Sequence, residues 1–312
     1  MKYHLGIDVG GTNIAAGVVD DKFNIVARNV VPTQPERPYE VVVADIVRAG
    51  RNCLAAAGAT VLDIDYVGIG VPSTIDEKTM RVAYANNLSW RDRDVIGEFK
   101  KSWDIPVYLA NDADSATYGE SVAGIAKKFD KCIMLTLGTG VGGGLIIDRK
   151  LYYGCEPGHV TIVADGEKCT CGRLGCLEAY ASVTALIRET IEVMRANPTS
   201  AMWELCGGET ANVSGRTAFN AAKQGDQTGI AIVKQYIHYL AVGVSNLITL
   251  LRPEAVILGG GICNEGEYLF GPLRKQVRDM IYAPEVLGVP LILKASLGND
   301  AGIIGTAFLG EM

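Results

Sequence analysis

The amino-terminal region contains two short apolar runs separated by glycine. Residues 3–8 alternate loosely and lead into Gly10 and Gly11, and a second β-rich run occupies residues 14–19. Two such runs joined by a glycine turn are typical of a β-hairpin. A third strand is expected over residues 24–30, so the chain begins with antiparallel pairing.

The next apolar positions change to helical spacing. They predict a helix that ends before Gly58, and they are Val43, Ile46, Val47, Gly50, Leu54 and Ala57. A strand over residues 66–71, a helix over 95–103 and a strand over 107–110 follow. This alternation of strands and helices predicts an α/β lobe.

The opening pattern then returns. Residues 8–20 align without gaps on residues 136–148, so that Gly10 matches Gly138 and Asp20 matches Asp148. Each copy reads as a strand, a glycine turn and a second strand that ends in aspartate. The repeat therefore predicts two related halves, each containing a β-hairpin, and not an array of short units.

The second half is richer in helix. Helices are expected over residues 182–195, 226–251 and 300–309, and a buried strand over 255–258 leads into a third glycine turn, Gly259-Gly260-Gly261. The repeat sets the lobe boundary near Ala113. We expect a small lobe of residues 1–112 plus 300–312, and a large lobe of residues 113–299.

Composition and charge narrow the functional classes. The chain has 312 residues, 48% of them hydrophobic, and a formal net charge of −6. Nucleic-acid binding draws on clustered Lys and Arg, so the charge argues against such a partner. The sequence has no bilayer-length apolar run and no signal peptide pattern, which predicts a cytoplasmic protein and no membrane partner.

The glycine turns are candidates for phosphate binding. Without a Cβ, the backbone approaches an anion closely and several N–H groups point at it. A tight hairpin without ligand is the alternative for any one turn, but two matched turns and a third after a buried strand favour phosphate. Residues 138–144 lead into a strand, whereas Walker and dinucleotide-binding motifs lead into a helix.

Two aspartates follow predicted strands. Asp8 stands beside the first glycine turn, where a carboxylate would orient Mg²⁺ directly or through water, and turn capping is its structural alternative. Asp112 follows Asn111 at a strand end before a predicted helix. It is therefore expected at the lip of a cleft, with helix N-capping as the alternative.

A cluster of cysteines lies near one of the three histidines. His159 precedes Cys169, Cys171 and Cys176, and glycines at positions 172 and 175 allow the loop to fold back. Three thiolates and an imidazole form a ligand set that Zn²⁺ accepts in closed tetrahedral sites. Reduced core thiols or redox-active thiols are the alternative.

Taken together, these motifs resemble the ROK family of bacterial sugar kinases and sugar-responsive repressors, in the actin and hexokinase superfamily. The resemblance covers nearly the whole chain. Its motifs are Asp8-x-Gly10-Gly11-Thr12, Asn87-Leu88-x-Trp90, Asn111-Asp112-Ala113, the turn 138–144, Glu156-x-Gly158-His159, Cys169-x-Cys171-Gly-x-x-Gly-Cys176-x-Glu178 and Gly259-Gly260-Gly261. It implies two RNase-H-like lobes, ATP and sugar bound between them, and a final helix that returns to the first lobe.

The resemblance also implies roles for single residues. Asp112 would be the catalytic base, and the three glycine turns would bind ATP. Asn87, Asn111, Glu156, His159 and Glu178 would contact the sugar along with Asp112, and His159 would also bind zinc. Gly10, Gly11, Thr12, Gly138 and Thr139 would face the phosphates, and Gly259, Gly260 and Gly261 the adenosine. Pro157 departs from the small or aliphatic residue usual in the family.

The implied reaction is ATP- and Mg²⁺-dependent phosphorylation of a hexose at its 6-hydroxyl, with a structural Zn²⁺. Glucose is the first expectation, ahead of N-acetylglucosamine, N-acetylmannosamine, mannose, allose and fructose. A non-enzymatic sugar-sensing regulator is the rival, although the first strand begins near residue 3 and leaves no room for a helix-turn-helix. An actin-type scaffold is a second rival, and a homodimer or higher homo-oligomer is the family expectation.

Overall fold

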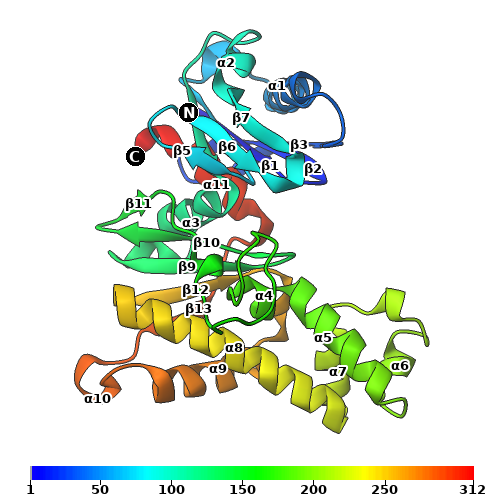
Figure 1. Cartoon of the computed structure of the whole chain (residues 1–312). Helices are drawn as coiled ribbons and strands as arrows, with labels where there is room; N and C mark the ends of the chain where they lie inside the picture. The colour runs from blue at the N-terminus through cyan, green and yellow to red at the C-terminus, as the bar shows by residue number, and fades with distance from the viewer. Residues whose placement is uncertain (1) are drawn as a thin grey trace. The chain divides into compact units, whose positions relative to one another are not determined.

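The computed structural model describes residues 2–312, and the packing of the chain divides it into two units (Figure 1). Unit 1 extends to Lys131 and also contains Gly144–Cys155 and Ala295–Met312. Unit 2 consists of Cys132–Gly143 and Glu156–Lys294. Both units combine helices with β-strands, as expected for an α/β protein.

A five-stranded sheet forms the centre of unit 1, in the order β3-β2-β1-β4-β8. Its strands are β1 (Tyr3–Val9), β2 (Asn13–Asp20), β3 (Ile25–Pro32), β4 (Val67–Val71) and β8 (Val107–Asn111). The first three strands pair antiparallel, and β1, β4 and β8 run parallel. The predicted hairpin and the strands after it are confirmed.

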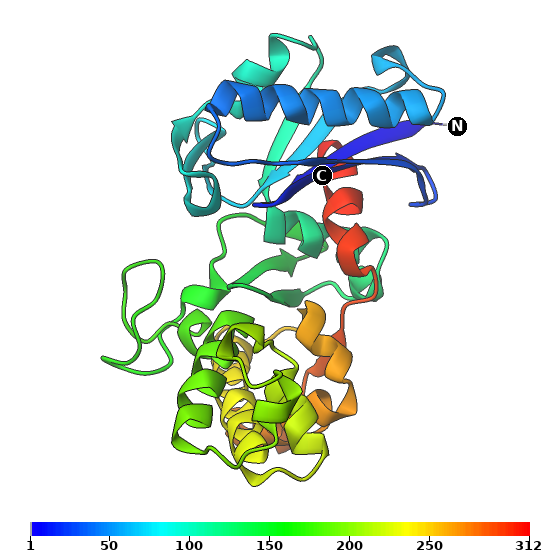
Figure 2. The ribbon, with the colours of Figure 1, turned by 90° about the vertical axis from the view of Figure 1, so that its right-hand side faces the viewer.

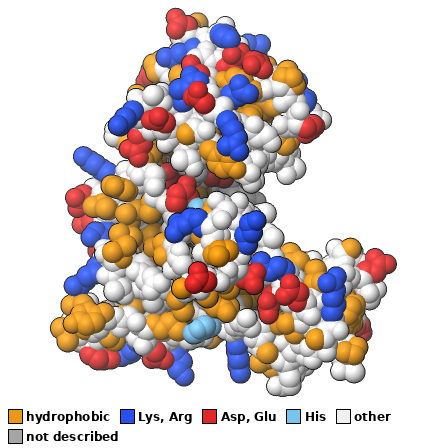
Figure 3. Space-filling model, in the orientation of Figure 1, with side chains coloured by type: hydrophobic (Ala, Val, Ile, Leu, Met, Phe, Trp, Pro, Cys, Tyr) orange, Lys and Arg blue, Asp and Glu red, His pale blue; other side chains and the backbone are white. Residues whose placement is uncertain are grey.

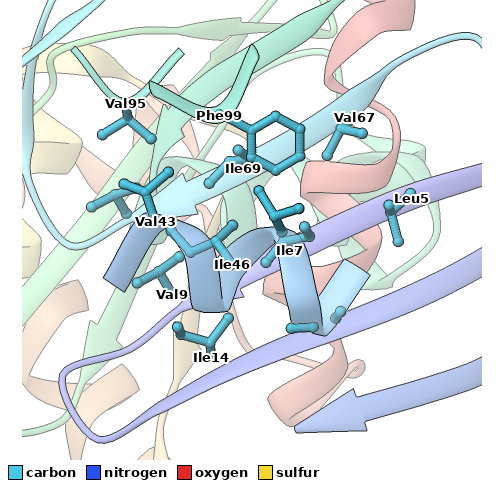
Figure 4. Close-up of a cluster of buried hydrophobic side chains, with 14 of the residues drawn as sticks. Leu5, Ile7, Val9, Ile14, Val43, Ile46, Val67, Ile69, Val95 and Phe99 are labelled. Atoms are coloured by element: carbon cyan, nitrogen blue, oxygen red, sulfur yellow. The ribbon is translucent and has the colours of Figure 1, made fainter. Parts of the chain in front are cut away.

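One face of this sheet holds the apolar core of unit 1. Leu5 and Ile7 of β1 are fully buried, and they pack with Ile46 of α1 (Tyr39–Ala56) and Phe99 of α2 (Val95–Lys100). Figure 4 shows these side chains converging between α1 and the strands. The predicted helix around residues 43–57 is thus confirmed, with its apolar stripe against the sheet.

The opposite face of this sheet packs closely against α11 (Ala301–Ala307) (Figure 2). Glycines allow this approach: a Cβ on Gly6 would lie 2.1 Å from the carbonyl oxygen of Ile303, and one on Gly68 would lie 1.8 Å from that of Thr306. Because side chains alternate along a strand, Asp8 shares the face of Gly6. The terminal helix therefore packs directly beside Asp8.

Unit 1 also contains a small sheet that the sequence pattern did not reveal and the helix that was expected after residue 111. A three-stranded antiparallel sheet consists of β5 (Thr74–Asp76), β6 (Arg81–Ala85) and β7 (Trp90–Arg93). It carries the short 3₁₀ helix Asn86–Leu88 between its last two strands. Helix α3 (Asp112–Val122) follows β8 and packs against α11.

The second five-stranded sheet repeats the strand order of the first, as β11-β10-β9-β12-β13. Its strands are β9 (Cys132–Leu137), β10 (Val141–Ile147), β11 (Lys150–Tyr152), β12 (Ala255–Gly259) and β13 (Leu291–Lys294). A hairpin again opens the sheet, and β9, β12 and β13 are again parallel. This shared topology confirms the two related halves predicted from the glycine repeat.

Helices make up most of the remainder of unit 2. They are α4 (Glu178–Ala181), α5 (Val183–Ala196), α6 (Met202–Leu205), α7 (Thr217–Lys223), α8 (Gln227–Leu251), α9 (Glu267–Met280) and α10 (Pro284–Leu287). The expected helices over residues 182–195 and 226–251 are confirmed as α5 and α8. Within residues 2–312, no helix has both the length and the apolar character needed to cross a membrane.

The division into units differs from the expected boundary near Ala113. Unit 1 retains α3 because α3 packs closely on α11: a Cβ on Gly119 would lie 2.2 Å from the carbonyl oxygen of Ala301. It also retains the residues after Gly143, since a Cβ on Gly144 would lie 2.6 Å from Oγ1 of Thr117 in α3. The expected boundary was inferred from a sequence repeat, which locates strands and turns. The packing of the chain places the boundary between the two units inside the second sheet.

Candidate active site

Parallel pairing brings Asp8 and Asp112 to one edge of the sheet in unit 1. Asp8 is in register with Gly70 of β4, and Gly70 is in register with Ala110 of β8. Asp112 begins α3 just after β8 ends. The two carboxylates therefore lie one strand apart at the carboxyl ends of parallel strands, where open α/β sheets bind ligands, and Gly70 between them has no side chain.

The environment of these carboxylates favours their neutral forms in the ligand-free chain. Burial, with a contribution from the negative charge of Asp112, raises the pKa of Asp8 to about 7. Burial also raises the pKa of Asp112 above its usual range. Gly302 of α11 borders Asp8, since a Cβ there would lie 2.5 Å from Oδ2 of Asp8. Partly buried carboxylates with raised pKa at a strand edge suit proton transfer or cation binding.

Asn111, rather than Asp112, caps helix α3. The Asn111 Oδ1 accepts hydrogen bonds from the backbone N–H groups of Ala113 at 2.7 Å and Asp114 at 3.2 Å. Its Nδ2 donates to the carbonyl oxygen of Ser73 at 2.8 Å. Asp112 occupies the first helical position, and its Oδ1 accepts from Ala113 N at 2.9 Å. The capping alternative considered for Asp112 therefore applies to its neighbour.

The glycine turn of unit 1 lies beside Asn87. The turn closes through a hydrogen bond from Gly10 N to the carbonyl oxygen of Asn13 at 2.8 Å. A Cβ on Gly11 would have one neighbour within 4 Å, the Cβ of Asn87 at 3.6 Å. Thr12 is exposed at the tip. The structure thus brings Asn87 next to the turn predicted to bind phosphate.

The two glycine turns of unit 2 also meet. Strands β9 and β12 are parallel neighbours, with Gly259 in register with Thr136. Gly260 has a φ of +101°, and a Cβ there would lie 2.1 Å from the carbonyl oxygen of Leu137. Gly138 is exposed with open space where its Cβ would be, and Thr139 is exposed as well. The two turns therefore lie side by side at the carboxyl ends of β9 and β12.

The Glu156–His159 segment packs on the start of β10. The 3₁₀ helix Pro157–His159 lies so close that a Cβ on Gly158 would be 1.8 Å from the carbonyl oxygen of Val141. Pro157 fills the space beside Gly143, whose Cβ would lie 2.6 Å from Cγ of the proline. Glu156 is exposed at the entrance to this segment and His159 is half-buried.

Glu178 connects this segment with the cysteine loop. Its Oε2 accepts from the backbone N–H of Val141 at 3.0 Å, and its Oε1 accepts from Oγ1 of Thr170 at 2.6 Å. The thiol of Cys169 also contacts Oε1, at 3.4 Å. The carboxylate of Glu178 is therefore held from two sides at the beginning of α4.

The predicted metal ligands form a single cluster. Ligand atoms of His159, Cys169, Cys171 and Cys176 all lie within 4.8 Å of one another. The Cys171 and Cys176 Sγ atoms are 3.8 Å apart, and Cys169 Sγ is 3.6 Å from His159 Nδ1. Tetrahedral Zn²⁺ with ordinary bond lengths requires ligand separations of about 3.5–3.8 Å. The cluster therefore has the donor types that zinc accepts, and these two separations match a tetrahedral site.

The loop that carries the cysteines is shaped by glycine and by hydrogen bonds to Arg173. Gly175 has a φ of +77°, and a Cβ there would lie 1.7 Å from the carbonyl oxygen of Val163. Arg173 donates to the carbonyl oxygen of His159 at 3.2 Å, joining the two arms of the loop. Figure 2 shows the loop between His159 and α4 extending from unit 2. Burial raises the pKa of Cys169 to about 12, so its thiolate requires a cation beside it.

The predicted site residues thus fall into two groups. Unit 1 brings together Asp8, Gly10, Gly11, Thr12, Asn87, Asn111 and Asp112. Unit 2 contains Gly138, Thr139, Glu156, His159, Cys169, Cys171, Cys176, Glu178, Gly259, Gly260 and Gly261. Sequence reasoning missed Thr170, which contacts Glu178, and Gly302, which borders Asp8. The position of Thr170 between two cysteine ligands was the available signal.

Comparison with known proteins gives a consistent identification. The model of the ROK family matches residues 4–311. A glucokinase of Streptomyces coelicolor is 36% identical over 100% of this chain and 98% of its own length, and one of Thermotoga maritima is 35% identical over 97% and 95%. The crystal structure of a ROK family glucokinase from Streptomyces griseus, in complex with glucose and AMPPNP, superposes with a TM-score of 0.84 at 35% identity and 98% coverage of both chains.

These similarities span full lengths, and the repeated sheet order agrees with the actin and hexokinase-like fold expected from the motifs. The chain belongs to the ROK family.

Proposed function

We propose that this protein transfers the γ-phosphoryl group of ATP to the 6-hydroxyl of glucose. The observation that carries the proposal is the pair of partly buried carboxylates, Asp8 and Asp112, at the carboxyl edge of the sheet in unit 1. Full-length similarity to curated glucokinases supports ATP as donor and glucose as acceptor. The complex of the Streptomyces griseus relative with glucose and AMPPNP supports the same pair of substrates.

Asp112 is the general base of this reaction. Its carboxylate accepts the proton of the 6-hydroxyl while the hydroxyl oxygen attacks the γ-phosphorus, and the bond from that phosphorus to the β–γ bridging oxygen breaks to release ADP. Burial raises the pKa of Asp112 and brings its basicity nearer to neutral pH. Asn111 supports the base, because its hydrogen bonds to Ala113 N and Ser73 O fix the start of α3.

The glycine turns hold the nucleotide. Gly10 and Gly138 close their turns through backbone hydrogen bonds, to Asn13 O and Gly140 O, and so shape the phosphate sites without a side chain. Gly11, Thr12 and Thr139 supply backbone N–H groups and hydroxyls for phosphate oxygens. Gly259, Gly260 and Gly261 face the adenosine. Asp8 would orient the Mg²⁺ that enters with ATP, which would supply positive charge beside the phosphates. The approach of Asp8 to Gly302 keeps its carboxylate at the strand edge.

Five residues in addition to Asp112 bind the sugar, namely Asn87, Asn111, Glu156, His159 and Glu178. Their side chains offer carboxylate, amide and imidazole groups, which suit the several hydroxyls of a hexose. Pro157 fills the space beside Gly143 and so fixes the approach of Glu156. Hydroxyl preference among hexoses is therefore set in part by that proline.

Zn²⁺ has a structural role in this proposal. His159, Cys169, Cys171 and Cys176 would provide four ligands and leave no open position for catalysis. His159 presents Nδ1 to the cluster, so its Nε2 is available to donate to a sugar hydroxyl. The metal would thereby hold His159 in place and anchor the loop that contacts Glu178.

The test is a coupled ADP assay with the purified protein, Mg²⁺ and ATP across a panel of hexoses. Glucose should give the highest kcat/KM, ahead of N-acetylglucosamine, N-acetylmannosamine, mannose, allose and fructose. A different preferred hexose would correct the substrate and leave the reaction class standing. Sugar binding without sugar-stimulated ADP release would instead indicate a sugar-sensing regulator, and nucleotide binding without sugar binding an actin-type scaffold.

Self-association and location complete the proposal. We expect a homodimer or higher homo-oligomer, and large apolar side chains around α10 are available for burial, with Tyr282 76% and Val286 84% exposed (Figure 3). Light scattering that gave the mass of one chain would contradict this. A cytoplasmic location is supported by the use of ATP and by eight cysteines that form no disulfide, and cell fractionation tests it.

A further inference from the structure

The carboxylate of Glu178 is fixed through both of its oxygens. The hydroxyl of Thr170 donates to Oε1 at 2.6 Å, and the backbone N–H of Val141 donates to Oε2 at 3.0 Å. The Cys169 thiol also contacts Oε1, at 3.4 Å, and the contact with Thr170 is the shortest of the three. Two donors on different oxygens fix the orientation of a carboxylate that would otherwise rotate about its side-chain bonds.

The position of Glu178 against the glycine turn leaves little room for movement on that side. A Cβ on Gly140 would lie 2.3 Å from Oε2 of Glu178, so the carboxylate rests directly on the turn backbone. Glycine at position 140 is thus required by this approach. On its other side, the carboxylate is oriented by Thr170.

The backbone around Thr170 is itself held in place. Thr170 lies between Cys169 and Cys171, and Cys169 N donates to the carbonyl oxygen of Arg173 at 2.9 Å. The base of the loop is tied to α4, since Leu177 N donates to the carbonyl oxygen of Val160 at 2.9 Å. The Thr170 hydroxyl therefore approaches Glu178 from a loop that also has backbone hydrogen bonds of its own.

We propose that Thr170 is a positioning residue for the sugar site, because its hydroxyl orients the Glu178 carboxylate toward the sugar. This inference rests on the proposed function, in which Glu178 binds a hexose hydroxyl. Thr170 needs no contact with the sugar for this role. It transmits the fixed geometry of the cysteine loop to the carboxylate that does make contact.

Two substitutions separate the hydroxyl from the packing of the side chain. Thr170→Val keeps the branched shape and removes the hydroxyl, whereas Thr170→Ser keeps the hydroxyl. Thr161→Val is the matched control, because Thr161 is in the same loop and its hydroxyl accepts from Arg173 at 3.2 Å. Each variant is compared with the native chain in glucose Kd by calorimetry, glucose KM, kcat, zinc content and melting temperature.

Loss of a hydrogen bond to a charged group should weaken glucose binding about tenfold in Thr170→Val. The expected result is a raised Kd and KM, with kcat at saturating glucose changed by less than about twofold, because Asp112 is untouched. Zinc content should equal that of the native chain. Thr170→Ser and Thr161→Val should bind glucose within about twofold of the native chain.

Three results would overturn the inference. Glucose binding in Thr170→Val equal to that of the native chain would show that the hydroxyl is dispensable. Equal losses in Thr170→Ser and Thr170→Val would assign the effect to packing, and loss of zinc in Thr170→Val would assign it to the metal cluster. The native chain distinguishes a failure of the proposed function, because a native protein that neither binds nor phosphorylates glucose would overturn both proposals.

Discussion

Asp8 and Asp112 lie one strand apart at the same edge of the sheet in unit 1, and the charge of Asp112 adds to burial in raising the pKa of Asp8 to about 7. Two carboxylates kept this close in a folded chain destabilise it when both are ionised. The ligand-free protein therefore bears a cost that a bound cation would remove.

The first prediction concerns the pH dependence of stability. The pKa of Asp8 in the folded chain, about 7, lies above its ordinary value of 3.8, so the folded chain binds more protons than the unfolded chain between these values. Stability consequently falls as pH rises from about 4 to about 7. Asp8→Asn removes this cost, and it should raise the melting temperature by several degrees at pH 8 and little at pH 4.

The matched control is Asp148→Asn, at the exposed turn after β10, which removes a carboxylate far along the chain from Asp8 and should leave the melting temperature near that of the native chain. In the presence of Mg²⁺ and AMPPNP, the native chain should have a higher melting temperature than Asp8→Asn, because the native carboxylate orients the cation and the amide does not. If Mg²⁺ and AMPPNP stabilised Asp8→Asn as much as the native chain, Asp8 would not bind or orient the metal.

The second prediction concerns zinc. Cys171→Ser replaces one of four ligands and should lower zinc affinity by about tenfold or more. Elemental analysis should find about one zinc per native chain and less after dialysis of the variant. Glucose affinity and melting temperature should fall together, because His159 and the loop at Glu178 lose their anchor.

Cys155→Ser, outside the cluster, should retain zinc and glucose binding in the same measurements. Prolonged treatment of the native chain with a strong chelator should reproduce the Cys171→Ser phenotype. A metal-free native protein with unchanged glucose affinity and stability would contradict the structural role of zinc.

The third prediction concerns the close approach of Gly158 to β10. A Cβ at position 158 would lie 1.8 Å from the carbonyl oxygen of Val141, which cannot move aside without shifting the strand. Gly158→Ala should therefore destabilise the chain by about 1–3 kcal/mol and displace Glu156 and His159, which weakens glucose binding. Calorimetric melting and glucose Kd provide the measurements.

The control for this change is Gly271→Ala in helix α9. Apart from its chain neighbours, a Cβ there meets only the flexible end of Glu267 at 3.6 Å. Alanine favours helix over glycine, whereas Pro272 disfavours the helical region for a preceding residue with a Cβ, and these two effects oppose each other. Gly271→Ala should therefore change stability much less than Gly158→Ala. Native-like melting and glucose binding in Gly158→Ala would show that the segment tolerates displacement.

Much of the fold could be predicted from the sequence because its strongest signal is a repeat. The match of Gly10 to Gly138 predicted two hairpins, and the sheets that contain them have the same strand order. The small sheet β5-β6-β7 was not predicted, since β7 is Trp90–Arg93 with three charged residues in four. Helix α9 was obscured by Gly271 and Pro272 in its interior.

The site was predictable where chemistry depends on residue type and spacing. Four metal ligands within eighteen residues of one another, His159 to Cys176, could be recognised, and the structure brings their ligand atoms together. The contacts of Glu178 with Thr170 and Val141 could not be predicted from the sequence. They depend on how the cysteine loop and the glycine turn before β10 fold against each other. For the same reason, sequence spacing could not identify Asn111 as the cap of α3.

The most direct test of the central claim is the rate of glucose 6-phosphate formation by Asp112→Asn, measured beside its glucose Kd. Removal of a general base should lower kcat by about 10²–10⁴-fold, while the amide, similar in size, leaves glucose Kd within a few-fold of the native value. Native kcat in Asp112→Asn, at an unchanged glucose Kd, would contradict the assignment of Asp112 as the base of an ATP-dependent glucose phosphorylation.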